Sequence, residues 1–429
     1  MLIDSLNINN WRQFDKVAIK FHPQLTLITG TNGSGKSTIL KIIATALGQP
    51  EILLATPIKS ERQGFIYKSG VNKRKITLSK DPTRMGFDLI GNLTLEGEQK
   101  FTLMIPKQTD VAYNIMLFTE VAESYLHVNS VHNFKGLYIR SHRPNTIYQQ
   151  VASIPTNIIN AETAYQNYNE SLTNLLNGHY HQYSPTYKIK EAIISMATFG
   201  PGNGDVQGNK DVDDVYRRFK EMLKNILPPE IGFIDISIRI PDVVLTTKTG
   251  DFIIDSASGG LMALIDLAWQ VFLASLNTKN LVVLLDEPEN HLHPSMQRTV
   301  MTSLLKAFPH VQFIVATHSP FVVTSVKDSS VYVLKHSGQS QYEERSEVSS
   351  IYLDNADKSG TASETLRDVL GVPVTLPLWA EEELKSITQK ISNTVFSHDT
   401  LDKLRGELKE AGLEEHFSSA LNLLLEGQK

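Results

Sequence analysis

An apolar strand, a glycine-rich turn and a helix follow one another near the N-terminus, expected at Leu25–Thr29, Gly30–Ser37 and Ser37–Leu47. The turn, GTNGSGKS, matches the pattern G-x-x-x-x-G-K-[ST] in full. Glycines let backbone N–H groups curl around a phosphate, and the helix N-terminus favours its negative charge. We expect Lys36 to reach the β- and γ-phosphates of a nucleotide and Ser37 to ligate Mg²⁺. The predicted nucleotide-binding residues here are Gly30, Thr31, Asn32, Gly33, Ser34, Gly35, Lys36, Ser37 and Thr38.

A second apolar run ends in two carboxylates. Residues 281–289 read LVVLLDEPE, a pattern typical of a strand buried on both faces of a parallel sheet. Asp286 is expected to hold Mg²⁺, directly or through water, and Glu287 to polarise the water that attacks the γ-phosphate. Solvated acids at a strand end are the alternative, but the presence of the phosphate-binding turn favours the catalytic interpretation.

A third apolar strand, within FIVATHSP at residues 313–320, ends in His318. A neutral imidazole at this point could hydrogen-bond the γ-phosphate and report its presence. A structural histidine is the alternative, and the position after a neighbouring strand favours the functional role.

A second helix N-terminus could also bind an anion. In ASGGLM, at residues 257–262, Ser258, Gly259 and Gly260 open a helix expected over Gly260–Ala274. Two anion sites for one nucleotide suggest that two subunits share it. A serine N-cap with a tight turn is the alternative.

Length and composition limit the remaining possibilities. A chain of 429 residues exceeds the size of one compact core, which stops growing near about 250–300 residues. The absence of cysteine excludes disulfides, thiolate metal sites and a cysteine nucleophile. No signal peptide and no apolar run long enough to span a bilayer is recognised, so we expect a cytoplasmic protein without membrane contact. The net charge is −5, but Lys59–Arg84 is locally basic and could contact nucleic acid, a partner protein or only solvent.

Strand and helix patterns divide the chain into segments. Phe199–Asp214, rich in Gly, Asn and Asp, is predicted to be a loop. Alternating strands and helices after residue 280 favour an α/β sheet. The expected segments are an N-terminal lobe at 1–110, a mixed and helical insertion at 111–230, a C-terminal lobe at 231–344 and a helical tail at 345–429 for partner or oligomer contacts.

These motifs, in this order, resemble those of the ABC-type ATPases. By this resemblance Gly30–Ser37 corresponds to Walker A, Ser258–Gly260 to the core of the signature motif, Asp286 and Glu287 to Walker B, and His318 to the switch histidine. The resemblance implies an ABC-type P-loop ATPase head with a β-rich N-terminal lobe, a helical insertion and a small helical tail. It also implies a homodimer, or a higher oligomer, that sandwiches ATP. Ser258 of one subunit would face the γ-phosphate held by Lys36 of the other.

The segments LNINNWRQFDKVAIKF, DEPENHLHP and ATHSP are similar to the RecF/SMC/OLD-like branch, which includes AAA ATPases of bacterial anti-phage defence of the Septu PtuA and PARIS AriA types. The resemblance covers about residues 1–50 and 250–335. The signature region departs from the family at Leu261, where glutamine is usual, and at Ala257, where leucine is usual. In this branch Arg12 could approach the nucleotide, although a solvated surface arginine is an equal alternative. The Q-loop glutamine stays open among Gln63, Gln149 and Gln150.

The resemblance favours an ATP-driven sensor or scaffold of a defence system that controls a separate effector, expected to be a nuclease. The tail contains a possible acidic pair, Asp354 and Asp357, but no complete nuclease constellation, so we predict no nuclease in this chain. The alternatives are a RecF-like DNA repair ATPase, favoured by the basic stretch, and the nucleotide-binding subunit of a transporter. The unusual signature and the HLHP motif argue against the transporter.

Overall fold

The computed structural model describes residues 1–60, 64–70, 86–107, 109–121, 124–128, 134–142, 147–179, 182–276, 278, 280–336, 347–354, 378–392, 398–417 and 420–421. The chain divides into two compact units, Met1–Ala362 and Ser363–Lys429.

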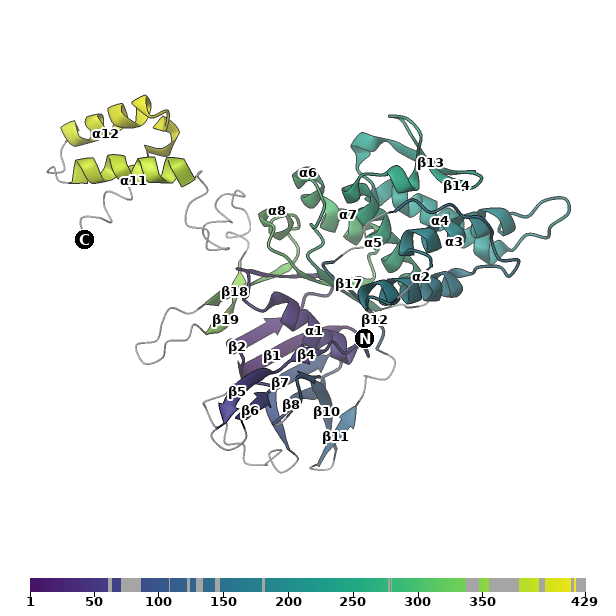
Figure 1. Ribbon diagram of the computed structural model, residues 1–429, viewed down its shortest axis with the longest axis horizontal. Helices are drawn as coiled ribbons and strands as arrows, with labels where there is room; N and C mark the ends of the chain where they lie inside the picture. The colour runs from purple at the N-terminus through teal and green to yellow at the C-terminus, as the bar shows by residue number, and fades with distance from the viewer. Residues whose placement is uncertain are drawn as a thin grey trace. The chain divides into compact units, whose positions relative to one another are not determined.

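Twelve of the described strands form one sheet in the first unit (Figure 1), in the order β11-β10-β8-β7-β1-β2-β19-β18-β3-β17-β16-β12. One half is antiparallel and consists of β1 (Ile3–Trp11), β2 (Phe14–Lys20), β7 (Phe87–Leu95), β8 (Gln99–Pro106), β10 (Met116–Val121) and β11 (Ser124–Val128). The other half is parallel and consists of β18 (Ser330–His336), β3 (Leu25–Gly30), β17 (Val311–Ala316), β16 (Leu281–Asp286) and β12 (Gly136–Ile139). Strand β19 (Val348–Leu353) joins the halves, because it pairs antiparallel with β18 and parallel with β2.

Three of the parallel strands are buried on both faces, and the continuous apolar sequences of two of them, β16 and β17, predicted this. All six residues of β3, of β16 and of β17 are buried. Helix α1 (Lys36–Ala46) covers one face, and its Ile39 and Ile43 share a core with Val282, Ile314 and the antiparallel strands. Because α1 follows β3 directly, the predicted phosphate-binding turn lies at the carboxyl end of β3. Ligands of open α/β sheets bind at this end of the strands.

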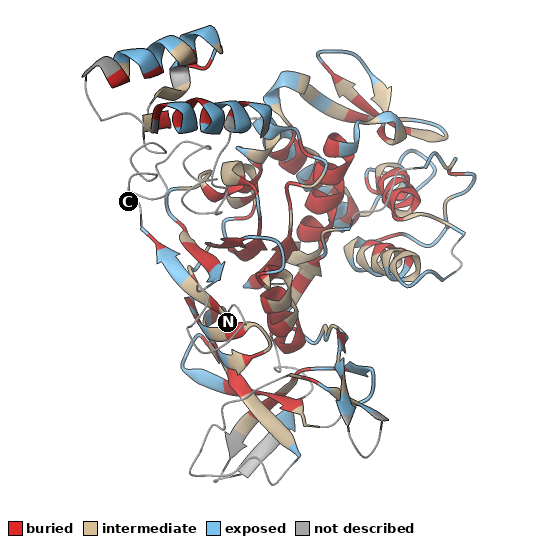
Figure 2. Cartoon of the chain, turned by 60° about the vertical axis from the view of Figure 1, so that its left-hand side comes forward, coloured by how far each residue is buried: buried red, intermediate tan, exposed pale blue. Residues whose placement is uncertain are grey.

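Helix α5 (Gly259–Leu276) packs against β12 and β16 and is almost wholly buried (Figure 2). Among the described residues it is the one helix long and apolar enough to cross a bilayer, yet 78% of that stretch is buried inside the protein. Such burial is characteristic of a core helix. Short helices follow two of the parallel strands. Helices α6 (Pro294–Gln297) and α7 (Val300–Ala307) come after β16, and α8 (Pro320–Val323) comes after β17.

Along the chain, three helices follow β12: α2 (Ala161–Leu176), α3 (Pro185–Phe199) and α4 (Lys210–Ile226). A small sheet of β13 (Phe233–Arg239), β14 (Asp242–Thr247) and β15 (Phe252–Ile253) follows them, with the 3₁₀ turns η2 (Pro229–Ile231) and η3 (Ile254–Ser256). The loop predicted for Phe199–Asp214 is too long, because α4 already begins at Lys210. The side chain of Asn209 accepts a hydrogen bond from the backbone N–H of Val212 and so caps this helix earlier than its polar composition suggested.

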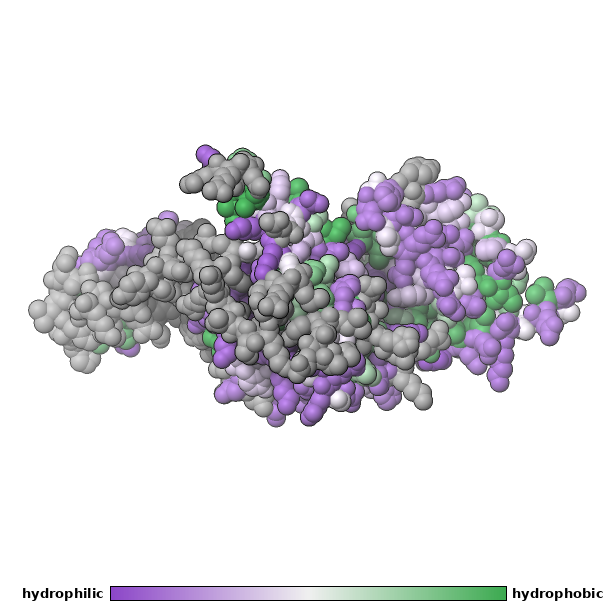
Figure 3. Space-filling view, turned by 90° about the horizontal axis from the view of Figure 1, so that it is seen from below, coloured by the Kyte–Doolittle hydropathy of each residue, from purple (hydrophilic) through white to green (hydrophobic). Residues whose placement is uncertain are grey.

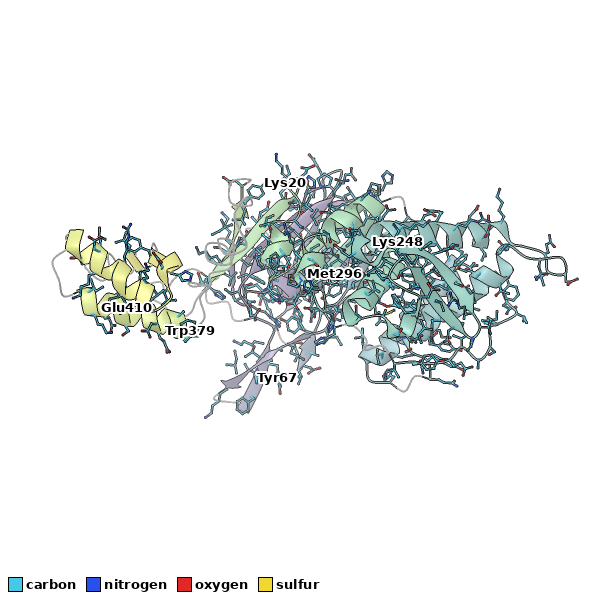
Figure 4. The ribbon with its side chains drawn as sticks, turned by 90° about the horizontal axis from the view of Figure 1, so that it is seen from above. Lys20, Tyr67, Lys248, Met296, Trp379 and Glu410 are labelled. Carbon is cyan, nitrogen blue, oxygen red and sulfur yellow. The ribbon has the colours of Figure 1, made fainter. Side chains whose placement is uncertain are left out.

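Two small strand pairs lie beside the antiparallel half: β4 (Leu53–Leu54) with β9 (Ala112–Tyr113), and β5 (Thr56–Ser60) with β6 (Gly64–Lys68). The second pair forms a hairpin that projects from the unit, as Tyr67 shows in Figure 4. It contains most of the described part of the basic stretch Lys59–Arg84, of which residues 61–63 and 71–84 lie outside the described residues. Seen from below in Figure 3, hydrophilic residues dominate the described surface of the helical insertion, and hydrophobic ones occur among them.

The second unit is a helical hairpin of α11 (Leu378–Ser392) and α12 (His398–Glu410), followed by η5 (Glu414–His416). It has a core of its own, made by Ala380, Leu384, Ile387, Ile391, Leu404, Leu408, Leu413 and Ala420. Asp354 ends the described part of the first unit, and Asp357 lies outside the described residues.

Candidate nucleotide-binding site

The glycines of the turn after β3 are required by its backbone. Gly30 has a φ of +143°, and a Cβ there would lie 2.5 Å from the carbonyl oxygen of Leu334 on β18. Gly35 has a φ of +99°, and its Cβ would lie 2.4 Å from the ring of Phe14. Any side chain would therefore push the turn away from the neighbouring strands. The pattern found in the sequence forms the tight turn that it predicted, and the binding of phosphate by this turn stays a prediction.

Lys36 begins α1 and lies across this turn. Its Nζ donates hydrogen bonds to the carbonyl oxygens of Gly30 (2.9 Å) and Thr31 (3.1 Å). Burial lowers the pKa of Lys36, while nearby carboxylates act in the opposite direction; they belong to Glu287, Asp286 and Glu289. A partly desolvated ammonium group has strong electrostatic attraction for a phosphate, because little water screens it.

Ser37 and Asp286 come from distant parts of the chain and meet at the carboxyl end of the sheet. The Ser37 hydroxyl donates to Oδ1 of Asp286 at 3.0 Å. Burial raises the pKa of Asp286, and the hydrogen bond from Ser37 offsets part of this effect. A hydroxyl and a carboxylate side by side are oxygen ligands of the type that Mg²⁺ prefers. The residues present thus fit the predicted metal position.

Glu287 follows β16 in an unusual conformation, with a φ of +49°. Its backbone N–H donates to the carbonyl of Ala316 on β17 (2.8 Å). Its carboxylate lies between Asn290, whose Nδ2 donates to Oε2 at 3.1 Å, and His318, whose Nδ1 is 3.4 Å from Oε1. The side chain is 28% exposed, so one of its faces can meet solvent. The structure therefore brings together the predicted catalytic glutamate and the predicted switch histidine.

Glu289 is a buried carboxylate beside Glu287 and His318 to which the sequence interpretation assigned no role. Its side chain is 4% exposed, and Oε1 accepts hydrogen bonds from the Thr317 hydroxyl (2.7 Å) and from the backbone N–H groups of His318 (3.0 Å) and Ser319 (3.2 Å). The carboxylate thereby fixes the loop that carries His318 to the segment that carries Glu287. The third acidic residue of DEPE was the available signal, because a carboxylate so close to a buried strand end needs a partner.

The segment predicted as a second anion site begins α5. Ser258 and Gly259 are exposed, whereas Gly260 is buried. A Cβ at Gly260 would lie 2.7 Å from the carbonyl oxygen of His291, so this glycine permits close packing against the loop after β16. The Ser258 hydroxyl accepts a long hydrogen bond (3.4 Å) from the N–H of Leu261. The serine therefore caps the helix while its outer surface stays accessible.

Arg12 lies in the turn between β1 and β2 with a φ of +52°. Its guanidinium donates to the Tyr113 hydroxyl (2.8 Å from Nη2) and to the carbonyl of Leu54 (2.7 Å). The residue after it contacts the phosphate-binding turn, because a Cβ at Gly35 would lie 2.7 Å from Nε2 of Gln13. Gln13 was not singled out in the sequence, and an isolated polar residue in a turn provides no signal that could have done so.

The three exposed residues of the turn are followed by a buried one. Thr31, Asn32 and Gly33 face solvent, and Ser34 is 0% exposed. The Ser34 hydroxyl has no hydrogen-bond partner among the described residues. A buried polar atom without a partner is costly, and one inside a phosphate-binding turn is available to a ligand. The described residues contain no group of three or more His, Cys, Asp or Glu that could hold a metal ion.

Comparison with known proteins gives a family for most of the chain. The sequence profile of the AAA ATPase domain family matches residues 1–323. The retron Vc95 probable ATPase of Vibrio cholerae is 23% identical over 455 aligned positions, which cover 91% of this chain and 83% of that protein. The Septu protein PtuA of Bacillus mycoides is 26% identical over 344 positions, which cover 77% of this chain and 40% of that protein, so this chain spans less than half of its length. Among solved structures, the SMC head domain from Thermotoga maritima has a TM-score of 0.43 at 14% identity, with 82% of this chain and 100% of that chain covered.

Proposed function

Because the chain belongs to the AAA ATPase domain family, we propose that it binds ATP at the turn Gly30–Ser37 and hydrolyses it with Glu287. The observation that carries this proposal is the meeting of three segments at the carboxyl end of the sheet. Lys36 and Ser37 come from the first segment, Asp286 and Glu287 from the second, and His318 from the third.

Each side chain has a task that its surroundings suit. Lys36 would bind the β- and γ-phosphates, and the Glu287 carboxylate would accept a proton from the attacking water. Mg²⁺ held by Ser37 and Asp286 would supply positive charge that neutralises the phosphate oxygens. The His318 imidazole, next to Glu287, would hydrogen-bond the γ-phosphate and change position when it is lost. Arg12 and the remaining residues of the turn would complete the nucleotide site.

We place the nucleotide between two copies of the chain. Ser258 and Gly259 are exposed at the N-terminus of an 18-residue helix, whose partial positive charge attracts an anion. Ser258, Gly259 and Gly260 of one copy would therefore bind the γ-phosphate held by Lys36 of the other. A homodimer or a higher oligomer would assemble with ATP and open after hydrolysis.

The biological role follows from likeness to the relatives. Relatives named as a retron ATPase and as a Septu protein favour a sensor or scaffold in bacterial anti-phage defence, working in the cytoplasm. ATP-dependent closure would control a separate effector protein, which we expect to be a nuclease. The tail expected to be helical over 345–429 begins with strand β19 of the main sheet, so we propose its helical part, α11 and α12, as the contact for a partner.

The test uses Glu287→Gln protein, which should keep ATP bound and stay closed. Size-exclusion chromatography with light scattering should show a dimer or larger assembly with ATP and Mg²⁺, and Lys36→Ala should abolish it. Affinity purification of Glu287→Gln from cells that carry the neighbouring genes, followed by mass spectrometry, should recover the effector in a fixed ratio. Wild-type ATP turnover by Glu287→Gln would refute the catalytic assignment, and recovery of the ATPase alone would refute the scaffold role.

A RecF-like repair ATPase is a second candidate, favoured by the β5–β6 hairpin. In its register Lys59 lies opposite Phe65, and Pro57 lies opposite Tyr67, so a cation and two aromatic residues share one face. Lys59 is exposed and Phe65 is 68% exposed. Aromatic rings beside a cation suit single-stranded nucleic acid. If Lys59→Ala/Phe65→Ala leaves ATP-dependent DNA binding at about 100 mM salt unchanged, or if no binding exists, this candidate is wrong.

A further inference from the structure

A buried lysine lies where segments of the larger unit meet. Lys190 of α3 has a side chain that is 0% exposed, and its Nζ donates to both carboxylate oxygens of Asp255, at 2.9 and 2.8 Å. The Asp255 side chain is 2% exposed. The same ammonium group donates to the backbone carbonyl of Gln149 and lies 5.0 Å from the centre of the Tyr148 ring. Buried charges require such complete pairing, and the pairing fixes the segments that provide it.

One of these segments leads to the second anion site. Asp255 lies in η3, and only Ser256 and Ala257 separate it from Ser258. The N–H of Ala257 donates to the carbonyl of Ile254 at 3.2 Å, which makes this connection a tight turn. The position of Asp255 therefore determines where the exposed Ser258 is presented.

Another segment leads to the hydrolysis site. Asn290, which donates to Glu287, also donates to the carbonyl of Ser141 at 3.3 Å, just after β12. The loop that carries Asn290 also meets the start of α5, because a Cβ at Gly260 would lie 2.7 Å from the carbonyl oxygen of His291. The Gln149 side chain binds the N-terminus of α3, because Oε1 accepts from the N–H of Ser184 at 2.8 Å.

The insertion is joined to α5 by a second buried polar contact. The hydroxyl of Tyr168 on α2 donates to Asp266 of α5, and Gln270 donates to the other oxygen of that carboxylate at 3.0 Å. Tyr168 is 0% exposed. Helices α2, α3 and α5 therefore carry polar side chains that specify one relative arrangement.

We propose that Lys190 is a positioning residue. It couples two places on the same copy of the chain: the hydrolysis site around Glu287 and the exposed surface at Ser258. That surface is the one which meets the nucleotide bound to the other copy. Lys190 holds Asp255, which positions Ser258 and the start of α5, and that start packs against the loop that carries Glu287 and Asn290. The proposal rests on the proposed function, because it takes Ser258 to meet the nucleotide of a second copy. The side chains of the helical insertion thus control dimer closure without touching ATP.

The experiment uses Glu287→Gln protein as the parent and the double variant Lys190→Met/Asp255→Leu. Removing both charges leaves no unpaired buried ion, so the double variant should stay folded. Lys188→Met/Glu191→Leu on the same helix is the matched control, because it likewise removes both members of an ion pair, whose side chains are 21% and 11% exposed. Binding of a fluorescent ATP analogue to dilute monomer, hydrogen exchange of residues 254–262 without nucleotide, and ATP-dependent dimerisation are measured for each protein.

We expect the double variant to bind the analogue within about two-fold of the parent, to exchange amides of 254–262 about ten-fold faster, and to need about ten-fold more protein to dimerise. Parent-like exchange and dimerisation would overturn the coupling, as would an equal loss of nucleotide affinity, which indicates general damage. If the Glu287→Gln parent itself stays monomeric with ATP, the proposed function fails and the coupling fails with it. A dimerising parent with a parent-like double variant overturns the coupling alone.

Discussion

Glu289→Gln tests how the loop with His318 is held. Oε1 of this buried carboxylate accepts three hydrogen bonds at 2.7, 3.0 and 3.2 Å, from Thr317, His318 and Ser319. Glutamine has the same shape and can offer its own oxygen to the same donors. The substitution therefore removes the charge of the acceptor and keeps its geometry.

The expected loss can be worked from these contacts. A hydrogen bond to a charged group contributes about 1.5–3 kcal/mol, against about 0.5–1.5 kcal/mol for a neutral one. Three bonds each weakened by about 1 kcal/mol would cost about 3 kcal/mol. Desolvation acts in the opposite direction, because a buried amide costs less than a buried carboxylate, and we take about 1 kcal/mol for it. The hydrogen bonds win, with a net destabilisation of about 2 kcal/mol, or about 2–3 °C in Tm for a unit of this size.

Differential scanning calorimetry measures the stability, and steady-state ATP hydrolysis measures the effect on the site. Because the imidazole of His318 lies 3.5 Å from this carboxylate, a loosened loop should lower kcat by about ten-fold or more. Glu221→Gln is the control, since it removes the same charge from an ion pair whose glutamate is 69% exposed and should change stability by under about 0.5 kcal/mol. An unchanged Tm together with an unchanged kcat in Glu289→Gln would refute the reasoning.

Three further substitutions address single contacts. Asn290→Ala removes the donor to Glu287 and should lower kcat about ten-fold with little change in KM, measured by steady-state ATPase kinetics. Burial raises the pKa of Asp286, so the penalty for folding with this group charged appears as pH rises above about 4. Asp286→Asn should therefore melt above the wild type at pH 7 without nucleotide, and the difference should vanish near pH 4 in melting curves. Gly35→Ala combines a left-handed φ with overlap on Phe14 and should cost about 3 kcal/mol and abolish nucleotide binding, measured by melting and titration.

A control variant or a contrary outcome tests the physical cause assigned to each substitution. Gly33→Ala controls for Gly35→Ala, because its φ is +80° but no atom lies within 4 Å of the added Cβ, so only backbone strain of about 1 kcal/mol is expected. Equal damage by the two substitutions would argue against the overlap with Phe14. A wild-type kcat in Asn290→Ala would show that the hydrogen bond from Asn290 is not needed to position Glu287 for hydrolysis. A stability difference for Asp286→Asn that does not depend on pH would contradict the assigned pKa direction.

The phosphate-binding turn and the strands around it could be predicted from the sequence because their determinants are local. The glycines, Lys36 and Ser37 are contiguous, and only a tight turn at a helix N-terminus uses them in that order. Continuous apolar runs likewise identified β16 and β17 as buried parallel strands. Helix boundaries were harder to predict, as α4 shows, which begins at Lys210 with Asn209 as its N-cap. The polar residues around this start fit a loop as well as they fit a capped helix.

What the tertiary structure alone decided is which distant side chains meet. Ser37 and Asp286 are 249 positions apart in the chain, and Lys190 and Asp255 are 65 apart, so no spacing rule relates them. The tasks of Glu289 and Asn290 depend on hydrogen bonds between loops that follow different strands. The type of each side chain determines whether it can donate or accept hydrogen bonds or carry a charge. Local sequence patterns indicate where the chain turns. The partners that satisfy a buried polar group are chosen only when the sheet brings the strand ends together and excludes water from them.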